Sequence, residues 1–157
     1  MNRVYSSSVS ALTVAQGTSA FTSIHNCIYQ PSSSVLVRAS IFDLIVGCSA
    51  TPADNATQWA LMPTTAAPTG GTAITARPMD SNDAAASTLA VSKPTSVMTL
   101  GSTFYMYMSV NQRVTWRWCA VPGSEIIMPV AVSSGICMNS YLDSTPAVRD
   151  TVIFFRE

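Results

Sequence analysis

The chain has 157 residues, of which 48% are hydrophobic and only 10% are charged, and its formal net charge is zero. This length fits one domain, and no apolar run approaches the ~18 residues that a membrane-spanning helix needs. The eight basic residues are scattered singly, which excludes the basic patch on which direct nucleic-acid binding depends. The first residues lack the apolar core of a secretory signal, so we expect synthesis in the cytoplasm.

The scarcity of charge predicts a neutral surface. Ordinary soluble domains carry about 25% charged residues, and a surface without net charge provides little repulsion between copies. The centres of protein interfaces are likewise poor in charge. We therefore expect a protein that packs against copies of itself or against a partner. The alternative is a monomer with a hydroxyl-rich surface.

The first 62 residues predict strands separated by short polar breaks. Alternation of side chains predicts strands over residues 3–6, 9–15, 18–30 and 57–62, with a break at Ser7 and Ser8. Residues 35–48 are apolar on both faces, which is typical of a strand that is covered on both sides. A helix is the competing interpretation of this segment. Its β-branched residues and terminal Gly47 favour the strand, with room for a bulge.

Residues 63–95 form the most loop-like tract, because proline, glycine and aspartate interrupt it repeatedly. Two short strands are predicted inside it, over residues 72–76 and 88–92. A structureless loop of this length is improbable in a compact domain. We expect an extended excursion that projects as an arm and reaches a neighbouring molecule. The alternative is a surface loop that folds back on its own domain.

Residues 100–132 carry three consecutive strand signals and predict a β-meander over 103–110, 114–119 and 126–132. In the first, Met106 and Met108 share a face opposite Tyr105 and Tyr107. Further strands are predicted over 135–141 and 151–155. The whole chain therefore predicts one all-β domain over residues 1–157, an antiparallel β-sandwich of about eight to ten strands with little or no helix.

Histidine and cysteine give no catalytic or metal-binding pattern. His25 is the single histidine and shares a strand face with apolar neighbours, so we interpret it as a partly buried structural residue. The four cysteines lack the paired spacing of a zinc site. In a protein made in the cytoplasm they are expected to be reduced core or sheet residues. These are Cys27, Cys48, Cys119 and Cys137.

Two further groups of residues have a structural and a functional interpretation. Trp116 and Trp118 share one strand face, where they act as core or interface anchors or, alternatively, as a platform for a carbohydrate. Asp80 and Asp83 flank Asn82, a composition that suggests calcium, but the ligand spacing of an EF-hand loop is missing. Asx-turn chemistry explains these residues more simply.

The order of these signals resembles the small virion proteins of tailed bacteriophages, the β-sandwich or jelly-roll proteins that decorate or cement a capsid. The likeness is carried by short strings spread over most of the chain: Thr69-Gly70-Gly71-Thr72-Ala73, the run from Pro78 to Ala85, the tryptophan-bearing strand, Pro122-Gly123-Ser124-Glu125 and Phe154-Phe155-Arg156-Glu157. The cysteine that follows Trp118 and the low charge content depart from that pattern.

The resemblance implies a jelly-roll-like structural protein without catalytic residues or cofactors. It would bind the major capsid protein on the outside of the capsid as a homotrimer and bridge neighbouring subunits, without contact to nucleic acid or membrane. The candidate interface residues combine the excursion with the tryptophan strand. They are Gly70, Gly71, Pro78, Asp80, Asp83, Trp116 and Trp118.

Two other functions fit part of the pattern. One is a minor tail or fibre component of a virion. The other is a carbohydrate-binding β-sandwich that uses Trp59, Trp116 or Trp118. An enzyme is not expected, because one histidine and no paired carboxylates leave no acid and base set.

Overall fold

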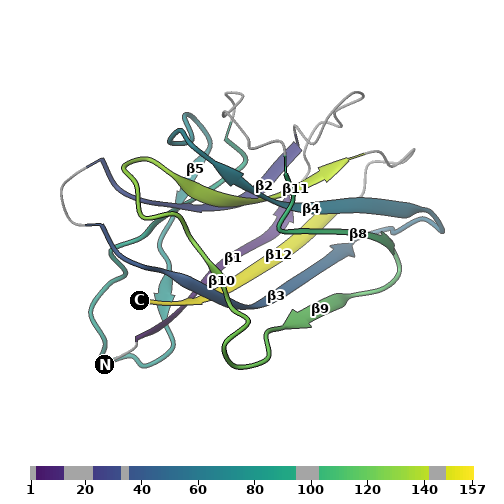
Figure 1. Ribbon diagram of the computed structural model, residues 1–157. Coiled ribbons are helices and arrows are strands. Elements are labelled where there is room, and N and C mark those ends of the chain that lie inside the picture. The colour runs from purple at the N-terminus through teal and green to yellow at the C-terminus, as the bar shows by residue number, and fades with distance from the viewer. Residues whose placement is uncertain (1–2, 13–22, 33–35, 95–102, 142–147) are drawn as a thin grey trace.

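The protein is a β-sandwich of two antiparallel sheets (Figure 1). The computed structural model describes residues 3–12, 23–32, 36–94, 103–141 and 148–157. These residues contain no helix, which confirms the predicted fold class, and none forms a helix long and apolar enough to cross a membrane. The strands are β1 (Val4–Leu12), β2 (Ser23–Tyr29), β3 (Ser40–Ser49), β4 (Ala56–Thr64), β5 (Thr72–Ile74), β6 (Arg77–Pro78), β7 (Leu89–Ser92), β8 (Met106–Asn111), β9 (Trp116–Cys119), β10 (Ile126–Ile127), β11 (Gly135–Tyr141) and β12 (Val148–Arg156).

The chain crosses repeatedly from one sheet to the other. Sheet A has the order β10-β3-β12-β1-β6, with β9 also paired to β3, and sheet B has the order β5-β7-β2-β11-β4-β8. The steps from β1 to β2, from β3 to β4, from β8 to β9 and from β11 to β12 each change sheet. Strands that are neighbours in a sheet are therefore mostly distant in the sequence.

This crossing overturns the predicted β-meander. The segments over 103–110, 114–119 and 126–132 do contain β8, β9 and β10, but these three strands do not pair with one another. β8 pairs with β4, whereas β9 and β10 pair with β3. The physical reason is burial: β8 and β9 both carry large apolar side chains on one face, and placing the strands in opposite sheets turns both faces toward one core.

The core between the sheets is built from alternate residues of the central strands. Every second residue of β12 from Arg149 to Phe155 is buried, and the residues between them are half-buried, which is the two-residue period of a strand. Ile41, Leu44 and Val46 of β3 are fully buried, and the register with β12 shifts beside Phe42. The predicted strand and its bulge are confirmed, although β3 begins at Ser40 and the described residues 36–39 are not in a strand.

β1 continues through the break that the sequence predicted at Ser7 and Ser8. Ser7 and Ser8 do not interrupt β1, because Ser7 lies in the core with a satisfied hydroxyl group. Its Oγ donates to Asn26 Oδ1 at 2.8 Å, and Asn26 Nδ2 donates back to the Ser7 carbonyl oxygen at 2.9 Å. This reciprocal pair joins β1 of sheet A to β2 of sheet B and allows polar residues inside the sandwich.

Cys27 and Cys137 are joined by a disulfide, so the prediction of four reduced cysteines is wrong for this pair. The two residues are 110 positions apart in the sequence but lie directly opposite each other on β2 and β11, with their Cα atoms 4.1 Å apart. With Ile24 and Val91 they form a second cluster, on the face of sheet B opposite the main core. Cys48 and Cys119 form no disulfide.

Candidate interaction surfaces

His25 is unsuited to catalysis because no part of it reaches the surface. Its side chain is fully buried, its Nε2 lies 2.6 Å from Ser140 Oγ, and its ring centre lies 5.1 Å from that of Trp59. Burial, together with the nearby positive charge of Arg149, lowers the pKa of His25 from 6.5 to about 3. The imidazole is thus neutral at physiological pH. The structure places it deeper than the expected partly buried position.

A metal centre has no ligand set in the part of the chain that the structure describes, where no three His, Cys, Asp or Glu residues come together. Asp80 instead accepts hydrogen bonds from the backbone and side-chain nitrogens of Asn82, at 2.9 and 3.2 Å. This is the predicted Asx turn.

The tryptophans are core residues. Trp59 is 1% exposed, and Trp116 and Trp118 of β9 are half-buried against the main core. Their rings therefore stabilise the sandwich, which agrees with the anchor interpretation. A carbohydrate platform needs an exposed ring face, and Trp59 does not offer one.

The remaining predicted interface residues lie at the edge where β5 and β6 end the two sheets, and they are tied to their own domain. Gly71 has a φ of +82°, and a Cβ atom there would lie 2.4 Å from the Ser92 carbonyl oxygen. Asp83 pairs with Arg3 at 3.4 Å. Pro78 lies in β6, an edge strand, where a missing amide hydrogen is tolerated.

The predicted interface residues do not lie together in the fold. β5 and β6 end one side of the sandwich, whereas β9 lies beyond β3 on the opposite side of sheet A. The seven predicted interface residues therefore form two groups. The excursion also differs from the projecting arm that we expected: β5 and β7 pair within sheet B, and β6 pairs with β1 in sheet A. The described part of residues 63–95 folds onto its own sandwich.

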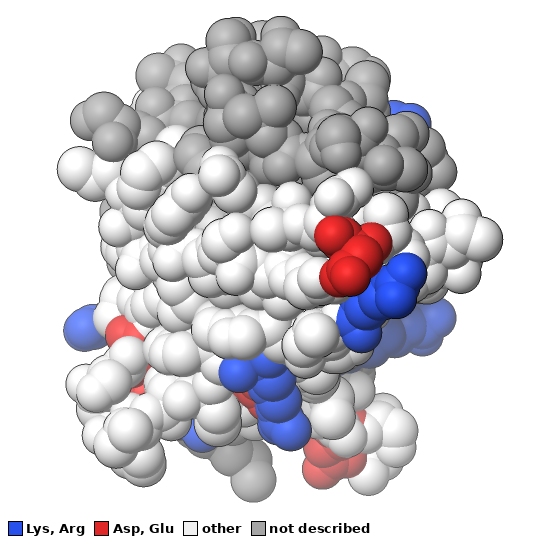
Figure 2. Space-filling view, turned by 90° about the vertical axis from the view of Figure 1, so that its right-hand side faces the viewer, with Lys and Arg blue, Asp and Glu red and all other residues white. Residues whose placement is uncertain are grey.

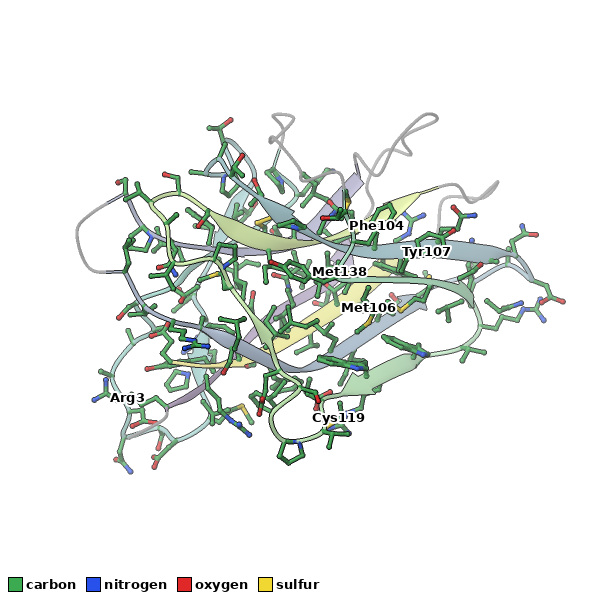
Figure 3. All side chains as sticks on the ribbon, viewed as in Figure 1. Arg3, Phe104, Met106, Tyr107, Cys119 and Met138 are labelled. Atoms are coloured by element: carbon green, nitrogen blue, oxygen red, sulfur yellow. A yellow bond between two sulfur atoms is a disulfide. The ribbon has the colours of Figure 1, made fainter. Side chains whose placement is uncertain are left out.

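A different surface is exposed and mostly apolar. We call it the β8 edge: the side of β8 that faces away from β4, together with the exposed side chains of Phe104, Tyr105, Tyr107 and Ser109. Phe104, Tyr105 and Tyr107 are 47%, 43% and 50% exposed, and the rings of Phe104 and Tyr107 lie 5.7 Å apart. Met106 and Met108, between them, pack against the core. Figure 3 shows Met106 and Met138 between the sheets and Phe104 and Tyr107 on the outer side.

The β8 edge differs from the other sheet edges among the described strands. β8 pairs only with β4 and carries no charged residue over six positions. β5 and β10 are three and two residues long, β6 contains Arg77 and Pro78, and β9 contains Arg117. Short length, proline and charge are the features that protect an edge from pairing with another chain. The sequence had shown the alternation of β8 but not which of its faces is outward.

The outer face of sheet A combines aromatic rings with fixed charges. The rings of Phe42 and Phe154 lie 6.3 Å apart, and the guanidinium carbon of Arg156 lies 4.5 Å from the centre of the Phe42 ring. Arg117 Nε donates to both oxygens of Asp43, at 3.0 and 3.1 Å. This hydrogen bonding and the charge of Asp43 raise the pKa of Arg117.

Figure 2 views the side on which the β8–β9 connection lies and shows a mostly uncharged surface with a few separate charged groups. No family model, curated protein or solved structure shows significant similarity to the chain. The function therefore has to be argued from these surfaces.

Proposed function

We propose that the protein is a structural subunit of a virus particle, one that decorates and cements the outside of a bacteriophage capsid as a homotrimer. The observation that carries the proposal is the β8 edge. β8 has six residues, none of them charged, and pairs only with β4 among the described strands, and three exposed aromatic rings lie on it or next to it. Such an edge favours pairing with another protein chain. A subunit of a shell is covered on several sides by neighbouring chains, so it can pair such an edge with one of them.

The strand order supports the jelly-roll part of the proposal. Sheet A contains β1-β12-β3-β9, and sheet B contains β2-β11-β4-β8. Taken in chain order, these eight strands change sheet at every step except that from β4 to β8, as in a double-sheet jelly roll, an architecture that viral capsid proteins and lectins share. The bacteriophage source rests on the resemblance of the short sequence strings.

The disulfide supports a position on the outside of the particle. Disulfides are rare in the cytoplasm but persist on the surfaces of virions, where no reducing system acts. The Cys27–Cys137 bond can form after the protein is made and leaves the cell. The tail of a particle is exposed to the same oxidising environment. The experiment therefore has to distinguish a position on the capsid from a position on the tail.

The test uses particles assembled without the protein. We expect the purified protein to bind them in many copies, to be visible over the shell by electron microscopy, and to raise the temperature at which the shells open. Sparse binding at one vertex would assign the protein to the tail or fibre. If the protein does not bind and the opening temperature is unchanged, the proposal is wrong.

A further inference from the structure

A cavity of about 410 Å³ lies on the outer face of sheet A, at the end where β12 finishes. Arg156, Ser40 and Ile127 are register partners on the adjacent strands β12, β3 and β10, so they form one row across the sheet. Arg38, Glu125 and Glu157 complete the lining. The chain has 16 charged residues, eight basic and eight acidic. Four of them line this one cavity. In a protein so poor in charge, this concentration needs an explanation.

The two carboxylates of the cavity already have hydrogen-bond donors. Glu157 accepts bonds from the backbone nitrogens of Thr88 and Ser87, at 2.7 and 2.9 Å. Glu125 accepts one from the backbone nitrogen of Gly123 at 2.9 Å and lies 3.4 Å from Nη1 of Arg156. Their negative charges are thus held by the protein, and neither carboxylate requires a cationic ligand.

The two arginines differ in how far they are engaged. Arg156 is held from one side by the Phe42 ring and from another by Glu125, through one of its five N–H groups. Arg38 is exposed, and its guanidinium has no hydrogen bond or ion pair with any residue that the structure describes. Between them, the two guanidinium groups retain most of their donors, next to the hydroxyl group of Ser40.

The geometry points to a binding site for a carboxylate. Guanidinium groups bind planar carboxylates through two parallel N–H···O bonds, and a fixed guanidinium loses little entropy on binding. A doubly charged phosphate would be repelled more strongly by Glu125 and Glu157 than a singly charged carboxylate. Because the cavity is much larger than a carboxylate, the group has to be carried on a larger body, which Ile127, 37% exposed, contacts through its apolar side chain. The bound carboxylate belongs either to an acidic side chain of a protein or to a free organic acid.

The site is tested in solution with the isolated protein, independently of the proposed capsid role. The probe is N-acetylglutamate methylamide, and the readout is NMR of the arginine Nε–H groups and the amides of Ser40 and Ile127. We expect saturable shifts with this probe and weaker ones with its neutral glutamine analogue and with inorganic phosphate. Arg38→Gln should weaken binding about tenfold. Arg113→Gln, an exposed arginine outside the cavity, is the matched control and should bind as the parent does.

Several results would overturn the inference: no saturable shift, equal binding by Arg38→Gln and Arg113→Gln, or phosphate binding at least as tight as the carboxylate. A second arm identifies the source by sedimentation without added ligand. If Arg38→Gln alone reduces self-association, a second copy supplies the carboxylate. If the probe binds and self-association is equal in both variants, the carboxylate comes from another chain or from a free acid.

Discussion

His25 shows at the scale of one residue how the fold changes a group's chemistry. An exposed histidine accepts a proton near pH 6.5, but burial holds this imidazole neutral down to about pH 3. Ser140 and the Trp59 ring enclose it, and the charge of Arg149 opposes its protonation. The residue is therefore a structural group whose neutral state the fold requires.

Protonation of His25 should destabilise the protein in acid. Below pH 6.5 the unfolded chain binds a proton that the folded chain refuses until about pH 3, so stability is lost as the pH falls through this window. The slope is at most about 1.4 kcal/mol per pH unit. In urea unfolding between pH 7 and 4, the parent should lose stability more steeply than His25→Gln. Equal slopes would contradict a buried neutral histidine.

The conformation of Gly71 should make it far more sensitive to substitution than Gly123. Both have positive φ, +82° and +89°, but a Cβ at Gly71 would meet backbone oxygen at 2.4 Å, whereas a Cβ at Gly123 has no atom within 4 Å. Gly123→Ala is expected to cost about 1 kcal/mol for its backbone conformation alone. Gly71→Ala should cost clearly more in thermal unfolding. A similar loss in both variants would show that β5 moves freely away from the loop after β7.

In sheet B, two central strands are cross-linked, and the strand at one end has an exposed edge. β2 and β11, at the centre of sheet B, are cross-linked by the disulfide. β8, at the end of the same sheet, pairs with β4 alone among the strands that the structure describes.

Removal of the disulfide should destabilise the folded protein. The bond closes a loop spanning 110 positions, and such cross-links typically contribute about 2–4 kcal/mol by restricting the unfolded chain. The double variant Cys27→Ala/Cys137→Ala should therefore melt well below the parent. Cys119→Ser, at an exposed free cysteine, should melt like the parent. Recovery of four free thiols from the denatured, non-reduced parent would contradict the cross-link.

A charge on β8 should prevent association without unfolding the domain. Tyr107 is 50% exposed on the β8 edge, and lysine is a common protection of edge strands. Tyr107→Lys is expected to change the stability of the monomer by less than about 0.5 kcal/mol and to shift sedimentation toward the monomer. Val130→Lys, at a 52% exposed apolar residue outside β8, is the control. Loss of association in both variants would mean that general surface hydrophobicity, and not β8, drives it.

The whole molecule is a neutral sandwich with charges collected at a few places, mainly the cavity beside Arg38 and the pairs Arg117–Asp43 and Arg3–Asp83. The β8 edge contains none of them. Contacts made there depend on apolar burial and backbone hydrogen bonds, which salt screens little.

Self-association should accordingly be almost independent of salt. Between 50 and 500 mM NaCl we expect the dissociation constant to change by less than about threefold, because no charged residue lies on the β8 edge. Analytical ultracentrifugation over this range measures it directly. A tenfold weakening would point to the charged face of sheet A as the interface.

The sequence alone determined the fold class, because alternation in segments such as β8 and β12 reflects a local property, the two-residue period of a strand. It also predicted that Tyr105 and Tyr107 lie on the face opposite Met106, but not which of the two faces meets the core. Strand partners, the disulfide and the cavity were decided by the tertiary structure. Each brings together residues far apart in the chain, as the disulfide joins Cys27 to Cys137 and the cavity is lined by both Arg38 and Arg156. Such contacts depend on which sheet each strand joins. Burial of the whole core decides this, and a local sequence pattern contains no information about it.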